Sequence, residues 1–243
     1  MKIPKSIEPD RIKDAIIEVH FESELPNEIN LGLFFRVLSG HYKYSNKSLG
    51  TKQLTSNSAS FEKEITLSLG GVSMFYNDKI KFQINQNSIA FNCVGKYILW
   101  ENYSKEIEKI LKLMLTVNSI KSFKGVGVRY VSEYINTDLV DSTNFSFSFG
   151  MPEVNSNNYS FRSEFDINEF KIVLNLSNKI PLVIDGHFTP ISLIDIDVIN
   201  NNFDIGNDFV KLFDIINNAH DLEKEIFFKI LKDSFLKILN PKY

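Results

Sequence analysis

The sequence has a single cysteine, Cys93, among 243 residues. One thiol excludes an internal disulfide framework and any zinc site built from several cysteines. Cys93 alternates with Ile89 and Phe91 in "SIAFNC", a pattern that favours a small buried side chain over a nucleophile. We therefore expect a reduced, cytoplasmic protein.

Long hydrophobic runs are also missing. Nowhere do 18 apolar residues follow one another, which argues against a membrane-spanning helix, and the opening "MKIPKSIEPDRIKDAIIEV" lacks the apolar core of a secretory signal. The net charge is −3 and the pI about 5.9, with charges of both signs scattered along the chain. Nucleic acid and anionic membranes are therefore unlikely partners on electrostatic grounds.

Recognisable catalytic motifs are absent from the sequence as well. It contains no glycine-rich phosphate loop, no H-E-x-x-H, no nucleophile elbow and no Cys/His pair at catalytic spacing. We expect no cofactor, and the sequence favours a protein that is not an enzyme.

What the sequence does contain is alternation typical of strands and spacing typical of helices, in separate blocks. In the first half we predict a strand over 14–23, a helix over 26–40 with Ile29, Leu33, Phe34 and Val37 on its apolar face, a polar solvated loop over 41–60, short strands over 61–69, 72–85 and 88–100, and a helix over 101–117. In the second half we predict strands over 125–135, 144–150, 158–166, 170–177, 181–188 and 191–199, then one long helix over 207–239.

Because strands precede helices rather than alternating with them, this order predicts an α+β fold: antiparallel sheet with helices packed on one face. Each half reads as a meander followed by a helix, so the chain divides into a 1–118 half and a 119–243 half that together form one compact unit. Whether the halves are a degenerate repeat stays open.

The stretch "GVGVRYVSEYI" (125–135) follows a predicted helix that begins near "W-x-x-Y" (Trp100, Tyr103). It resembles a sporadically distributed family of uncharacterised bacterial proteins, whose strand at this point reads roughly R-I-G-L-R-Y-I-N. Further similarities lie in "IDIDV" (194–198) and in "NAHDLEKEIFF", a helical histidine followed by phenylalanine. The resemblance places the family's glycine, arginine and tyrosine on Gly127, Arg129 and Tyr130, whereas Gly125 and Ser132 depart from it. It implies an accessory gene, such as phage-defence or mobile-element cargo, and carries no activity.

Alternation places Val126, Val128 and Tyr130 on one face of this strand and Gly127 and Arg129 on the other. Gly127 predicts a bulge or a close approach by a neighbouring element. Two interpretations of Arg129 remain: an ion pair with a carboxylate or a helix C-terminus, or an anion-binding group in a cleft.

Acidic residues recur in "PLVIDGHFTPISLIDIDVI" (181–199). If the apolar residues of both strands face the same core, a turn over 189–191 places Asp185 opposite Asp195. Four residues then share the outer face: Asp185, His187, Asp195 and Asp197. Solvated charges, a salt-bridge network and a divalent-metal or catalytic site all fit this arrangement.

His220 lies seven residues from both Phe213 and Phe227 and so falls on the apolar stripe of the last helix. It is either a core histidine with a hydrogen-bond partner or a group that contacts a ligand.

Three functions follow from these observations. The first is a non-enzymatic interaction or sensing module, which binds the product of a neighbouring gene or a second copy of itself; the alternation "FSFSF" (145–149) would supply a partly apolar face. The second is a cavity protein with a small ligand near Arg129, Tyr130 and His220. The third is a metal-dependent hydrolase using the acidic residues near 185–197.

Overall fold

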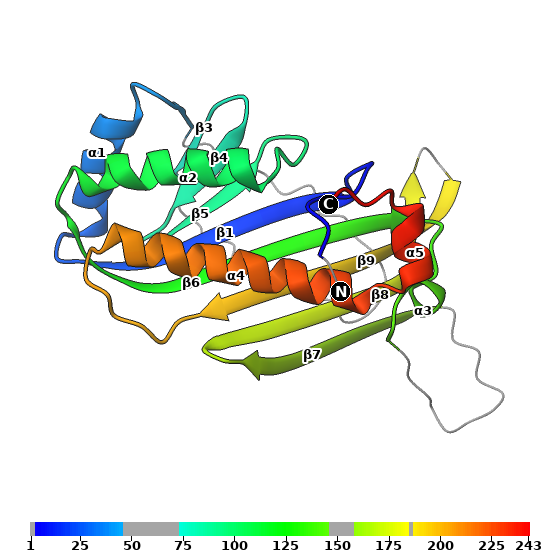
Figure 1. Cartoon of the computed structure of the whole chain (residues 1–243). Helices are drawn as coiled ribbons and strands as arrows, with labels where there is room; N and C mark the ends of the chain where they lie inside the picture. The colour runs from blue at the N-terminus through cyan, green and yellow to red at the C-terminus, as the bar shows by residue number, and fades with distance from the viewer. Residues whose placement is uncertain (1–2, 46–72, 146–157, 185–186) are drawn as a thin grey trace.

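A computed structural model describes residues 3–45, 73–145, 158–184 and 187–243. These residues form five helices and one antiparallel sheet of nine strands in the order β2-β3-β4-β5-β1-β6-β9-β8-β7 (Figure 1). The predicted α+β class with an antiparallel sheet is confirmed. In chain order the elements are β1 (Ile12–Ser23), α1 (Asn27–Leu38), β2 (Lys43–Ser45), β3 (Met74–Tyr76), β4 (Ile80–Ile84), β5 (Ser88–Cys93), α2 (Trp100–Leu115), β6 (Ile120–Ile135), α3 (Leu139–Ser142), β7 (Tyr159–Ile167), β8 (Phe170–Ile184), β9 (His187–Asn200), α4 (Phe209–Ile230) and α5 (Asp233–Ile238).

The long strands β1 and β6 pair at the centre of the sheet. Every second residue of β1 is buried from Ala15 to Phe21, and β6 buries Val126, Val128 and Tyr130. This alternation is what a sheet with one covered face requires, because successive side chains point to opposite sides.

Helices α2 and α4 lie along the same face of the sheet (Figure 1). The apolar stripe of α2 is buried as its spacing predicts: Tyr103, Ile107, Ile110, Leu111 and Met114. The Tyr103 hydroxyl also donates a hydrogen bond to the Ala15 carbonyl (3.0 Å), so this helix is joined to β1 by a polar contact as well as by packing.

The two halves of the chain repeat one order of elements. In each, a central strand (β1 or β6) is followed by a helix (α1 or α3). A meander then returns to pair with the central strand through β5 or β9, before a longer helix, α2 or α4. The predicted division after residue 118 falls between α2 and β6.

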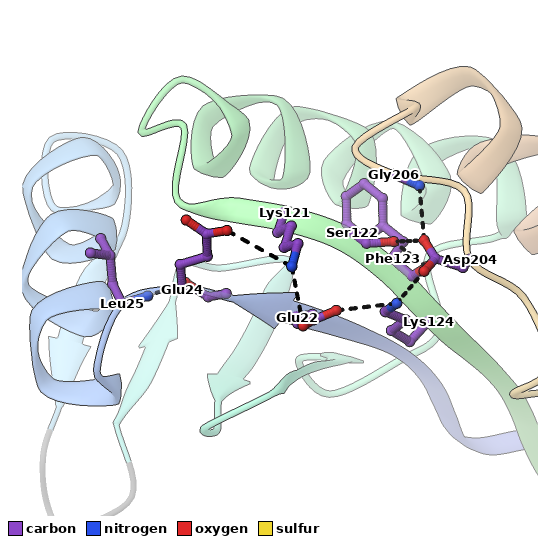
Figure 2. A network of polar contacts seen from close by, with 10 residues as sticks. Glu22, Glu24, Leu25, Lys121, Ser122, Phe123, Lys124, Asp204 and Gly206 are labelled. Carbon is purple, nitrogen blue, oxygen red and sulfur yellow. Dashed lines mark hydrogen bonds and ion pairs between the residues drawn. The ribbon is translucent and has the colours of Figure 1, made fainter.

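A polar network holds the segment between β9 and α4 against the first part of β6 (Figure 2). Asp204 accepts hydrogen bonds from the Ser122 hydroxyl and the Lys124 ammonium, and Lys124 also pairs with Glu22 at 3.1 Å. The hydrogen bond from Lys124, followed by that from Ser122, lowers the pKa of Asp204 to about 2. The network fixes the point from which the chain enters α4.

Several predicted boundaries are wrong. The single helix over 207–239 is two helices, because the chain is extended at Leu231 and Lys232; there Leu231 bridges to Thr143 and the Lys232 amide donates to the Ser142 carbonyl. The strands predicted over 170–177 and 181–188 are largely one strand, β8, with an irregularity between Ser177 and Ile180.

The first helix buries Asn30, Phe34 and Leu38, whereas Ile29 is exposed. The predicted loop over 41–60 begins with strand β2, and its residues from 46 onward lie outside the described part of the chain, as do the predicted strand over 61–69 and residues 146–150 of the "FSFSF" region.

Candidate functional site

A cavity of about 470 Å³ lies between β6, α4, the turn before α2 and the segment around residues 5–12. Its buried surface comes from Tyr130 and Ser132 of β6 and from His220, Glu223 and Phe227 of α4. Pockets for small ligands fall in the same size range, about 300–1,000 Å³.

The periodicities of the two elements bring these side chains together. Tyr130 and Ser132 are two residues apart in a strand and so share its inner face. His220, Glu223 and Phe227 follow one another at spacings of three and four, which aligns them along one side of a helix. Both His220 and Glu223 are nearly inaccessible, at 7% and 6% exposed.

Aromatic rings form most of one wall. The imidazole of His220 stacks on the indole of Trp100, with ring centroids 4.0 Å apart and planes inclined by 13°. Tyr97 and Tyr130 contact each other edge to face, and their hydroxyls are 3.2 Å apart. The stack joins α4 to the first residue of α2, so the wall depends on both helices.

Burial shifts the pKa values of two cavity-lining residues of α4, His220 and Glu223, in the direction that favours their neutral forms. Burial, reinforced by the charge of Lys224, lowers the pKa of His220 to about 3. Its Nδ1 atom has no hydrogen-bond partner in the described part of the chain. Burial raises the pKa of Glu223 well above its usual value, and no hydrogen bond or ion pair to a described residue satisfies its carboxyl group.

Lys224 follows Glu223 directly but is occupied elsewhere. Its ammonium donates a hydrogen bond to the Lys5 carbonyl (3.0 Å), and burial lowers its pKa. The Lys5 amide in turn donates to the Lys242 carbonyl (2.6 Å). These contacts build the rim of the cavity; the charge of Lys224 opposes the raised pKa of Glu223, although the two side chains form no salt bridge in the described part of the chain.

Leu99 forms part of the wall in a conformation rare for a side-chain-bearing residue, with φ of 66° and ψ of 150°. Such backbone strain costs about 1–3 kcal/mol and concentrates at binding sites. Its carbonyl accepts hydrogen bonds from the backbone amides of Asn102 and Tyr103 in the first turn of α2. The strained residue therefore also helps to set the direction of that helix.

Of the residues predicted to hold a ligand, the structure brings Tyr130 and His220 together, with ring centroids 5.6 Å apart. Arg129 lies on the opposite face of the sheet, because neighbouring residues in a strand point in opposite directions. Its guanidinium donates two hydrogen bonds to Asp195, from Nε (2.8 Å) and Nη2 (2.7 Å). The prediction of one site shared by all three residues is wrong, and the ion-pair interpretation of Arg129 is confirmed.

The predicted bulge or close approach at Gly127 is also wrong. Gly127 pairs with Glu18 without a register shift, and a Cβ atom there would meet nothing nearer than 3.9 Å. The close approach is at Gly125 instead, where a Cβ atom would collide with the Asn201 side chain, next to an irregularity in the β1–β6 pairing.

The predicted pairing of Asp185 with Asp195 is wrong, because β9 begins at His187 and Asp195 lies opposite Asn175. Asp185 itself is outside the described residues, and the exposed His187 sits at the far end of β9 from Asp195. Within the described residues, no three potential metal-ligating side chains come together.

Asp195 and Asp197 do share the outer face with Arg129. Burial raises the pKa of Asp197 to about 6, the Arg129 charge opposes the increase, and the Asp195 charge adds to it. Asp195 is paired with Arg129 and also accepts a hydrogen bond from Asn175 (3.2 Å). This outcome matches the salt-bridge network that was one of the open interpretations.

Sequence reasoning missed Glu223, Trp100 and Tyr97. A signal for Glu223 was present, because it lies three residues after His220 on the same predicted apolar stripe. Nothing in the local sequence of 97–100 indicates that it meets α4. Cys93 is half-buried, and burial raises the pKa of its thiol.

No helix among the described residues is both long and apolar enough to cross a membrane. Comparison with protein-family models and with curated proteins finds no match to this chain.

Proposed function

We propose that this protein binds a small organic molecule in the cavity between β6 and α4. The observation that carries the proposal is a cavity of about 470 Å³ whose aromatic wall surrounds two buried, ionisable side chains, Glu223 and His220, and the Nδ1 atom of His220 has no hydrogen-bond partner among the described residues. A buried polar group without a partner costs about 1–3 kcal/mol. A ligand that supplies the missing hydrogen bonds would recover part of that cost, and the aromatic rings would supply the apolar contact area.

Trp100 makes this proposal testable, because it is the only tryptophan and lies in the cavity wall. A library of small polar, apolar, anionic and cationic compounds should contain binders that change its fluorescence. The control is His220→Phe, which keeps an aromatic ring against the indole but removes both imidazole nitrogens. Compounds that contact this part of the cavity should bind it with altered affinity.

Native mass spectrometry of freshly purified protein provides the complementary measurement, because a retained ligand adds mass. If the protein has only the mass of its sequence and no compound class changes Trp100 emission, the proposed function is wrong.

A second candidate is supported by the paired ends of β8 and β9. Val183 and Phe188 lie opposite each other there and are 60% and 81% exposed. Exposed apolar side chains that are adjacent favour a protein partner, in line with the interaction module and accessory operon that the sequence suggests. Light scattering after size-exclusion chromatography tests self-association: a wild-type oligomer that becomes monomeric in Phe188→Ser supports this candidate, and a strict monomer that co-purifies with nothing argues against it.

A further inference from the structure

The inner surface of the cavity contains one acidic group and no basic group to match it. Glu223 is the only carboxylate among its buried lining residues, and the buried polar groups beside it are Ser132, Tyr130 and the neutral His220. The three lysines of the lining are at the rim, where they are accompanied by three acids: Lys5, Lys224 and Lys242 with Asp10, Glu101 and Asp221. The rim is therefore balanced in formal charge and the interior is not.

Glu223 is close enough to the aromatic wall for its charge to act there. Burial raises the pKa of Tyr130 well above 10, and the charge of Glu223 contributes to the increase. The same charge contributes, after burial, to the raised pKa of Tyr97. Glu223, Tyr97 and Tyr130 all line the same cavity, so a ligand that fills it can contact both the carboxyl group and the rings.

An ammonium group satisfies both features at once. It donates charge-assisted hydrogen bonds to a carboxylate, which are about twice as strong as neutral ones, and it is attracted to aromatic faces. An ammonium beside Glu223 would favour the ionised carboxylate, whereas an anionic ligand would favour the neutral acid and a neutral alcohol would do neither.

We infer that the ligand is a small organic cation, an ammonium group attached to an apolar body, with its nitrogen at Glu223 and its body against Tyr97, Trp100 and Tyr130. This inference rests on the proposed function and names the ligand class for the same cavity.

Three probes of matched shape test it: benzylammonium, benzyl alcohol and benzoate. Their dissociation constants are measured by Trp100 fluorescence and by isothermal titration calorimetry at pH 7.5 and fixed ionic strength. Benzylammonium should bind at least about tenfold more tightly than benzyl alcohol, as expected of a charge-assisted hydrogen bond, and benzoate should bind most weakly.

Two variants on α4 locate the effect. Glu223→Gln keeps the shape of the side chain but cannot ionise, so benzylammonium should lose its advantage and bind about as weakly as benzyl alcohol. Glu225→Gln makes the same substitution on a residue that pairs with Lys229 and does not line the cavity; it should bind all three probes as the wild type does. Unchanged binding of benzyl alcohol to Glu223→Gln shows that the variant keeps its cavity.

The outcomes separate the two proposals. If benzyl alcohol or benzoate binds as tightly as benzylammonium, the ligand is not a cation, although the cavity still binds small molecules. Equal losses in the two variants would remove Glu223 from the site. If none of the three probes binds to the wild type, the cation inference fails, whereas the binding function fails only if the compound library and native mass spectrometry are negative as well.

Discussion

Removal of Arg129 should strongly destabilise the fold while leaving the cavity intact. Asp195 is 8% exposed, and its two carboxylate oxygens both accept hydrogen bonds from the guanidinium. In Arg129→Ala the carboxylate stays buried with the Asn175 amide as its remaining described hydrogen-bond partner and Asp197 as a like-charged neighbour. Breaking a fully buried pair costs about 3–5 kcal/mol because a buried charge is left uncompensated; since the Arg129 and Asp195 side chains are 31% and 12% exposed, we expect a loss of about 2–3 kcal/mol.

Two further variants separate the charge from the geometry. Arg129→Lys keeps the charge but cannot donate from two positions in a plane, so we expect a loss of about 1–2 kcal/mol. Changing both Arg129 and Asp195 to leucine removes the pair altogether. This double variant should be more stable than Arg129→Ala, since apolar replacements of buried ion pairs are often neutral.

Urea denaturation followed by far-ultraviolet circular dichroism measures the free energies of unfolding. For a chain of this size each kcal/mol corresponds to about 2–4 °C in Tm, so Arg129→Ala should melt about 4–12 °C lower. A loss below about 1 kcal/mol, or a double variant as unstable as the single one, would refute the reasoning. Binding of cavity probes to folded Arg129→Lys should match the wild type, because Arg129 and the cavity lie on opposite faces of the sheet.

Three other predictions concern stability. Gly127→Ala should be neutral or stabilising by up to about 1 kcal/mol, whereas Gly125→Ala should cost up to about 1 kcal/mol, less than overpacking in a core, because its Cβ atom displaces the end of the exposed Asn201 side chain; equal effects in urea denaturation would contradict this. The pKa of His220 is 6.5 in the unfolded chain and about 3 in the folded protein. Between pH 6.5 and 3 the unfolded chain therefore binds a proton that the folded protein does not, and acidification should lower the free energy of unfolding by up to about 4–5 kcal/mol. An equally steep dependence of stability on pH in His220→Phe would refute this. Asn144→Ala should cost about 1 kcal/mol, because this side chain donates to the Lys229 and Leu231 carbonyls (both 3.1 Å) where α4 ends, and faster hydrogen exchange confined to that end would confirm the cause.

Local periodicity predicted the parts of the fold that depend on one buried face. In β1, β6 and α2 the buried residues are the apolar residues of the sequence pattern. Those elements and the class of the fold could therefore be inferred from the sequence. The proximity of Tyr130 to His220 could be proposed for the same reason, because each lies on the inward face of its own element.

Strand register could not be inferred in the same way. The argument for a turn over 189–191 assumed that residues 181–188 line the core, but Leu182, Val183 and Phe188 are all exposed. Lys179, with φ of 49°, also interrupts β8 before this point. Alternation fixes register only where one face is buried, so an exposed strand end carries no such information.

The break between α4 and α5 depends on a distant segment. Asn144 donates hydrogen bonds from its backbone amide and its side chain to the carbonyls of residues 229–231, and the Ser142 carbonyl accepts one from the Lys232 amide. The sequence "FFKILKDSF" itself contains no proline or glycine that would end a helix. The sequence favours one continuous helix, but the tertiary contacts with residues 142–144 divide it into α4 and α5. Tertiary structure overrides local helix propensity here.

The location of the cavity follows from how the two halves meet. Helix α2 follows the first meander and helix α4 follows the second, and the central strand β6 lies beneath α4 (Figure 1). The Trp100–His220 stack joins the two helices, and the paired residues Ser6 and Lys242 add to the lining of the cavity. Side chains from both halves are therefore needed to enclose Glu223. In the sequence alone Glu223 looks like an ordinary surface charge on a helix, because the residues that bury it come from distant parts of the chain.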